Sequence, residues 1–194
     1  MTPDFSSPDW MNRKFEEKWT LNGNHFDRPE GVYSGELYTK HMLNFIKEGK
    51  ESKKPWFAYM AFTTAHFPIQ APANLIDKHY QFYLEKGYEG LKRYRYEKLI
   101  ENGLISEVSL PSQENDLVKK WSELTQKEKE YQAKVFATYA AEIKDQDNRI
   151  GEIITYLKES NQLENTLIVY LSDNGRKVWK QITLILEIKN LGNG

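Results

Sequence analysis

The 194-residue chain contains no cysteine, and this absence excludes a whole class of chemistry. Without cysteine there is no disulfide, no thiolate metal ligand and no thiol nucleophile. The sequence therefore gives no information on the redox compartment. The chain also lacks an excess of charge of either sign, with 27 Lys+Arg against 28 Asp+Glu. A chain so balanced has no general electrostatic attraction for nucleic acid or for an anionic membrane surface, and we expect neither as a partner.

Long apolar runs are missing as well. None approaches the roughly 18 residues that a membrane-spanning helix requires, and residues 1–5 lack the apolar core of a secretion signal. We therefore expect a soluble chain that makes no membrane contact, of unknown compartment. Aromatic side chains, in contrast, are abundant. Twelve Tyr, nine Phe and five Trp predict a packed core rather than a disordered chain.

Two short apolar runs predict buried strands. They are residues 55–62 (PWFAYMAF) and residues 166–171 (TLIVYL), and residues typical of turns bound both. Helical patterns lie between them along the chain, and strands joined by helical crossovers run parallel. The sequence therefore predicts an α/β fold in which both strands end at the same edge of a sheet. Two strands are too few for a stable sheet, so further strands are needed to complete it.

Apolar periodicity predicts the helices. One begins with Ser34 as its cap and ends at Gly49, two short helices cover residues 74–83 and 88–102, and Thr125 caps a long helix that reaches about Glu159. Residues 1–30 show no such period and are predicted to be irregular. The apolar face expected for the long helix consists of Tyr131, Val135, Tyr139, Ile143, Gln146, Ile150, Ile153 and Leu157.

Polar side chains follow each predicted strand. His66 comes shortly after the first strand, and Asp173 and Asn174 follow the second. Ligands of open α/β sheets bind at the carboxyl ends of the strands, and the oxygens of Asp and Asn suit calcium or magnesium. Taken alone, these residues have simpler explanations, because Asp-Asn-Gly is a common turn and a lone histidine is more often a hydrogen-bonded structural residue.

Three stretches in order resemble sulfatases of the arylsulfatase type, within the alkaline-phosphatase superfamily. Residues 55–72 (PWFAYMAFTTAHFPIQAP) resemble the strand-and-histidine segment of that family, residues 139–151 (YAAEIKDQDNRIG) its long helix, and residues 165–175 (NTLIVYLSDNG) its metal-binding strand. Residues 33–39 (YSGELYT) add weaker support. The similarity runs from about residue 30 to residue 175.

This resemblance implies a partial three-layer fold with mostly parallel strands flanked by helices. Residues 1–175 then form part of a sulfatase catalytic domain, and residues 176–194 are a divergent tail. In the family a metal ion, usually calcium, is held in part by the Asp-Asn pair, so Asp173 and Asn174 are expected metal ligands. His66 is expected to contact the sulfate and to help the leaving oxygen depart. The substrate of a full-length relative would be a sulfated small molecule or glycan.

The departures from the family are large. The family's nucleophile is a formylglycine made from cysteine or serine, and the cysteine type is impossible because no cysteine exists. The stretch from Ser109 to Gln113 (SLPSQ) imitates the serine-type signature, but Gln stands where the family has Arg, and the stretch follows His66 instead of preceding it. The aspartate pair of the family's amino-terminal half has no counterpart, which leaves the calcium ligand set incomplete. Lys144 stands where the family usually has Asp.

We therefore interpret the chain as a central fragment of a sulfatase that is inactive in isolation. Two alternatives stay open. The chain is a non-catalytic remnant of a sulfatase gene, or it belongs to a related phosphodiester or phosphonate hydrolase of the same superfamily. The His-Phe-Pro-Ile-Gln-Ala-Pro context around His66 favours a sulfatase.

Overall fold

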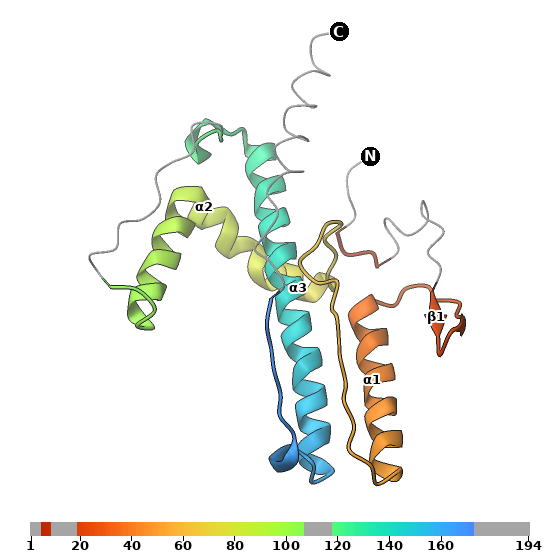
Figure 1. The fold of residues 1–194 in the computed structure, drawn as a ribbon. Helices are drawn as coiled ribbons and strands as arrows, with labels where there is room; N and C mark the ends of the chain where they lie inside the picture. Colours follow the sequence, from red (N-terminus) through yellow and green to blue (C-terminus); the bar gives the residue numbers. More distant parts are fainter. Residues whose placement is uncertain (1–4, 9–18, 107–117, 173–194) are drawn as a thin grey trace. The chain divides into compact units, whose positions relative to one another are not determined.

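A computed structural model describes residues 5–8, 19–106 and 118–172 of the chain. Three helices dominate it: α1 (Ser34–Glu51), α2 (Ala73–Glu101) and α3 (Gln126–Glu159) (Figure 1). The described residues also form two 3-10 turns, η2 (Trp121–Glu123) and η3 (Leu163–Asn165), and two short strands, β1 (Thr20–Leu21) and β2 (Asn24–His25). Residues 1–156 and 157–194 are two compact units. Within the described ranges, no helix is both long enough and apolar enough to cross a membrane.

The strands β1 and β2 pair as an antiparallel hairpin within a region that the sequence predicts to be irregular. Asn22 and Gly23 join them, with φ values of 53° and 80°. Two consecutive residues with positive φ are what a two-residue type I′ turn needs, and Asn-Gly adopts this conformation most readily. The residues flanking the hairpin stack on α1, with the Trp19 and Tyr38 rings 5.7 Å apart. The prediction of irregular structure is thus wrong for residues 20–25.

Helix α1 begins where the sequence predicts, but by a different contact. Tyr33 occupies the cap position without a side-chain cap bond, and Ser34 is the first helical residue. The Ser34 hydroxyl oxygen lies 3.3 Å from that of Thr63 instead. The helix also continues past Gly49, where a Cβ atom would lie 3.2 Å from Trp56 Cδ1. Gly49 therefore serves to admit the indole ring and does not terminate the helix.

Helix α2 joins the two short helices that the sequence predicts, with a kink at Gly87. Gly87 has φ 60° and ψ −169°, a conformation that only glycine adopts readily. The indole of Trp121 lies directly against it, because a Cβ atom on Gly87 would be 2.6 Å from Trp121 Cδ1. Trp121 in turn contacts Tyr88 edge to face at 4.9 Å, and Tyr88 lies 6.0 Å from Phe136 of α3. The kink thus couples α2 to η2 and α3.

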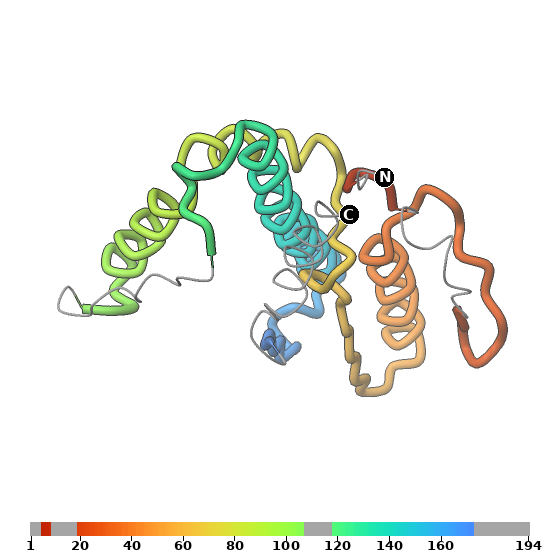
Figure 2. The backbone as a smooth tube through the Cα atoms, turned by 90° about the horizontal axis from the view of Figure 1, so that it is seen from above, coloured from red at the N-terminus to blue at the C-terminus, as the bar shows by residue number. Residues whose placement is uncertain are grey.

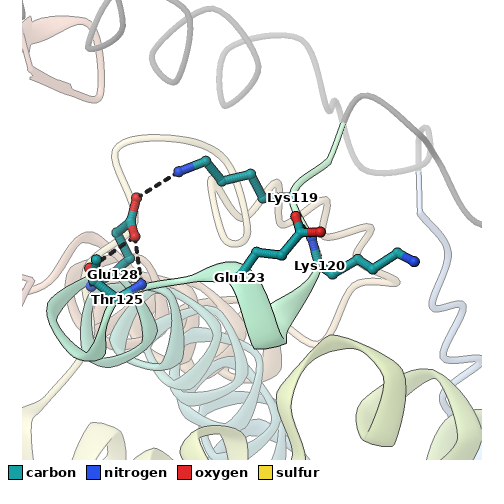
Figure 3. A network of polar contacts seen from close by, with 5 residues as sticks. All are labelled: Lys119, Lys120, Glu123, Thr125 and Glu128. Carbon is teal, nitrogen blue, oxygen red and sulfur yellow. Dashed lines mark hydrogen bonds and ion pairs between the residues drawn. The ribbon is translucent and has the colours of Figure 1, made fainter.

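The start of α3 confirms the predicted cap. The Glu128 backbone N–H donates to the Thr125 hydroxyl oxygen at 3.3 Å, and the Thr125 N–H donates to Glu128 Oε2 at 2.7 Å (Figure 3). These reciprocal bonds are a capping box, which satisfies two backbone donors that a helix start leaves open. Lys119 Nζ lies 3.3 Å from the other Glu128 oxygen. The bonds from Thr125 and then Lys119 hold the pKa of Glu128 below its usual value.

The buried face of α3 is made largely of small residues. Ala133, Ala137 and Ala141 are completely buried, spaced four residues apart along one side of the helix. The predicted apolar face is correct at Val135 and Leu157, which are buried, and wrong at Ile143, which is 42% exposed. The alanines let other segments approach closely, and a core forms there. Its buried members are Phe5, Ile69, Ala71, Leu75, Ile76, Val135, Ala137 and Ala141.

The two predicted strands do not form strands among the described residues. Residues 55–62 and 166–171 are neither helix nor strand, and Figures 1 and 2 show residues 55–62 as an extended trace running back past α1. Phe57 is 89% exposed and Leu167 is 89% exposed, so the prediction that these runs are buried is wrong here. A strand is held by hydrogen bonds to a neighbouring strand. Within the described ranges, the sheet consists of β1 and β2 alone.

We predict that Gly87→Ala destabilises the fold by at least about 2 kcal/mol. Gly87 has φ 60° and ψ −169°, a region essentially restricted to glycine, where another residue costs about 1–3 kcal/mol. The methyl group would also displace the Trp121 ring. Gly103→Ala separates the two effects, because Gly103 has φ +68° and no atom within 4 Å of the place that a methyl group would take. Urea unfolding should show a distinctly larger loss for Gly87→Ala than for Gly103→Ala. Equal losses would mean that the Trp121 contact contributes nothing.

Candidate functional site around His66

His66 lies on the loop that joins residues 55–62 to α2. Its backbone N–H donates to the Thr63 carbonyl oxygen at 3.2 Å, and its ring Nδ1 lies 2.7 Å from the Phe67 carbonyl oxygen. A carbonyl oxygen only accepts, so Nδ1 carries the proton in this contact. His66 is exposed, and this bond engages Nδ1 and leaves Nε2 available. When this imidazole is also protonated at Nε2, it can donate a proton to a bound oxygen.

The loop following His66 is anchored in the core. Ile69 and Ala71 are 8% and 1% exposed, and the Ala71 N–H donates to the Phe5 carbonyl oxygen at 3.0 Å. Between them, the Gln70 N–H donates to Glu142 Oε1 of α3 at 2.9 Å, across 72 residues of sequence. The loop is therefore held by apolar contacts on both sides of this polar bond.

Glu142 is the strongest electrostatic feature of this region. The residue is 9% exposed, and burial raises the pKa of its carboxyl group to about 8, although the backbone N–H groups of Gln70 and Ala65 act in the opposite direction. Its Oε2 atom and the nearby Gln70 Nε2 atom are buried without a hydrogen-bond partner of ordinary geometry. The apolar period of the sequence does not reveal Glu142, because that period assigns the core face of α3 to the large apolar residues. Glu142 lies seven residues after Val135 and four after the buried Thr138, so a face drawn through those two residues would have included it.

The predicted metal ligands cannot be compared with His66 in space. Asp173 and Asn174 lie outside the described residues, so the convergence of all three side chains stays a prediction. Over residues 5–8, 19–106 and 118–172, no three His, Asp or Glu side chains are grouped so as to hold a metal ion. Lys144, which stands where the family usually has Asp, forms an exposed ion pair with Asp147 at 2.7 Å.

A groove of about 270 Å³ lies elsewhere, between the hairpin and α1, and does not include His66. Its lining is mostly aromatic and aliphatic, so it offers shape and apolar contact but no set of charged groups for an ester substrate. The lining residues are Trp19, Thr20, Leu21, Phe26, Leu37, Tyr38, His41, Met42, Phe45, Tyr59, Met60 and Ala61.

Comparison with known proteins identifies the family. The sulfatase family profile matches residues 4–184, nearly the whole chain, and the chain therefore belongs to the sulfatase family. It is 38% identical to an arylsulfatase of Klebsiella aerogenes over 162 residues, which is 83% of this chain and 34% of that protein. It is 35% identical to an uncharacterised sulfatase of Schizosaccharomyces pombe over 147 residues, which is 75% of this chain and 26% of that protein.

These matches confirm the resemblance that the sequence motifs indicate. Family membership also indicates an alkaline-phosphatase-like α/β fold, although the described residues are mostly helical and contain two short strands. The chain spans only about a third and a quarter of the lengths of these two relatives. It therefore corresponds to one segment of them, and this segment includes the loop that carries His66.

We predict that Glu142 makes the stability of the fold depend on pH. The folded-state pKa of about 8 lies above the reference value of 4.5, so the folded state binds this proton more tightly than the unfolded state. The free energy of unfolding therefore falls as the pH rises from about 4.5 to 8 and then levels off. Each pH unit within this window is worth up to about 1.4 kcal/mol.

The matched control is Glu142→Gln, which keeps the shape and an acceptor oxygen but cannot ionise. Urea unfolding between pH 5 and pH 9 gives the free energy of unfolding of both chains. The difference between the two values removes the contribution of the titrating groups that both chains share. Wild type should lose stability relative to Glu142→Gln as the pH rises. A difference that stays constant over this range would show that Glu142 is not a buried titrating acid.

Proposed function

We propose that this chain is the His66-bearing segment of a sulfuric ester hydrolase of the arylsulfatase type. The observation that carries the proposal is that a chain of the sulfatase family presents an exposed His66 on a loop anchored in its core, with ring Nδ1 held by the Phe67 carbonyl oxygen. The substrate class we propose is a sulfate ester of a small molecule or glycan.

His66 would act at the leaving group. Cleavage of a sulfate ester leaves negative charge on the departing oxygen, and a proton donor placed there lowers the barrier. The Phe67 carbonyl oxygen holds Nδ1, which fixes the ring orientation and leaves Nε2 available to a substrate. Exposure of the ring is consistent with this role, because the substrate must reach Nε2 from outside.

Asp173 and Asn174 would contribute to a calcium site. Both supply oxygen donors of the kind that calcium prefers, so the residues fit the ion in type. Two side chains provide fewer than the six to eight oxygens that calcium usually takes, and the remaining ligands must come from elsewhere. When bound, the ion would neutralise charge on the sulfate oxygens.

We further propose that residues 55–62 and 166–171 are parallel strands in the complete sulfatase fold. Both runs have the composition of strands buried on two faces, and both expose large apolar side chains among the described residues, Phe57 and Tyr170 for example. Neighbouring strands would cover these side chains and supply the strand-to-strand backbone bonds that hold a strand. His66 would then lie just beyond the end of one strand, at the edge where the sheet binds ligands.

The test is a chimera in which this chain replaces the matching stretch of the Klebsiella aerogenes arylsulfatase. We expect the chimera to cleave an aryl sulfate, and we expect His66→Ala in it to lower kcat by about 10²–10⁴, as loss of a general acid does. A folded but inactive chimera would favour the non-catalytic remnant. Preference for a phosphodiester or phosphonate would favour the alternative hydrolase. Full activity of His66→Ala would show that His66 has another role.

We predict that the isolated chain does not turn over an aryl sulfate, even with added calcium. Cysteine is absent, and the serine-type stretch at residues 109–113 departs from the family signature, so we expect no formylglycine. Loss of a catalytic nucleophile costs several orders of magnitude in rate. The measurement is release of the phenol by the purified chain, compared with a buffer blank. Turnover above the blank that disappears in His66→Ala would reveal a nucleophile other than formylglycine.

A further inference from the structure

The loop that carries His66 is joined to α3 by a polar contact. This contact is the bond from the Gln70 N–H to Glu142 Oε1, at 2.9 Å. Other backbone bonds of the loop are short-range, such as that from the His66 N–H to Thr63 at 3.2 Å, or involve the Ala71–Phe5 pair. The position of the loop relative to α3 is therefore set by Glu142 together with the apolar packing of Ile69 and Ala71.

The placement of Glu142 indicates why this contact matters. It follows Ala141, which is completely buried, so the Glu142 backbone lies in a closely packed part of α3. Its backbone cannot shift easily there, because close-packed interiors leave little free volume. Gln70 lies four residues after His66, and Ala65, whose N–H also acts on the carboxyl group, precedes it. Glu142 thus acts on the loop on both sides of His66.

We infer that Glu142 is a positioning residue, whose carboxylate fixes the backbone of the His66 loop and thereby the direction in which His66 Nε2 points. This inference rests on the proposed function of His66, since positioning matters for catalysis only if His66 meets the substrate. A catalytic group held loosely loses rate steeply, because productive geometry tolerates displacements of only about 0.5 Å. Glutamine would accept the same bond but cannot ionise at any pH, and this makes it the matched control.

The experiment uses the full chain labelled with ¹⁵N and with ¹³C in the histidine rings. It compares wild type with Glu142→Leu, Glu142→Gln and Glu142→Asp. Leucine has a similar volume but no oxygen to accept the Gln70 bond. Glutamine keeps an acceptor oxygen at the same position. Aspartate keeps an acceptor oxygen on a side chain that is one methylene group shorter. Two quantities are followed for each variant: hydrogen exchange of the Gln70 amide, and the ring signal of His66, assigned by its loss in His66→Asn. Exchange at Ala137 and Ala141 reports whether α3 stays intact.

We expect Glu142→Leu to speed exchange of the Gln70 amide by about tenfold or more, the amount that loss of one hydrogen bond of about 1.4 kcal/mol gives. The His66 signal should shift or broaden in the same variant, while exchange at Ala137 and Ala141 stays at the wild-type rate. Glutamine should restore both readouts, and aspartate should fall between. A purely structural role would change Gln70 exchange without moving the His66 signal, and this result would overturn the inference.

Two further measurements test the role of Glu142 and the proposed function of His66. If Glu142→Leu unfolds α3, the Glu142→Asp chain carries the test, and a wild-type His66 signal in it would overturn the inference. Titration with inorganic sulfate addresses the proposed function separately. A sulfate-dependent shift of the His66 signal in wild type supports a sulfate-binding role. Its absence counts against that role, while the exchange pattern of the variants still decides whether Glu142 positions the loop.

Discussion

The row of buried alanines on α3 is the constraint on which the described structure depends. Ala133, Ala137 and Ala141 leave no side-chain bulk beyond a methyl group, so the segment containing Ile69 and Ala71 can lie directly against the helix. This close approach brings the Gln70 N–H within 2.9 Å of Glu142. A larger residue in the row would hold the loop away from the helix and break that bond. The position of His66 therefore follows from the packing of the helix beneath its loop.

Polar and apolar contacts act together at this place. Apolar packing brings the loop close to the helix and excludes water. The exclusion of water makes the Glu142 carboxyl group costly to ionise and raises its pKa to about 8. The hydrogen bond from Gln70 offsets part of that cost and gives the loop a defined register. A second coupling of this kind joins α2 to α3, where Gly87 admits Trp121 and the aromatic contacts continue through Tyr88 to Phe136. At Gly87 the absence of a side chain admits Trp121, and at the alanines of α3 a methyl group is small enough to admit the loop.

The exposed runs at residues 55–62 and 166–171 show the opposite situation. Their composition is that of buried strands, yet Phe57, Tyr59 and Leu167 are largely exposed. Strand formation depends on a partner at hydrogen-bonding distance, whereas a helix satisfies its backbone within its own segment. The helices of this chain therefore form as the sequence predicts, and the strands do not. The matched part of this chain corresponds to about a third of the length of the arylsulfatase relative.

The sequence by itself determined what local chemistry dictates: the cap of α3 at Thr125 and Glu128, the helical periods, and the motifs around His66 that indicate the sulfatase family. It also predicted Asp173 and Asn174 as metal ligands, which lie outside the described residues. Only the tertiary structure decided which face of α3 is buried, because alanine gives a weak signal in an apolar pattern and a strong one in close packing. It alone showed that Glu142 reaches the His66 loop, since no local pattern reports a contact between residues 72 positions apart.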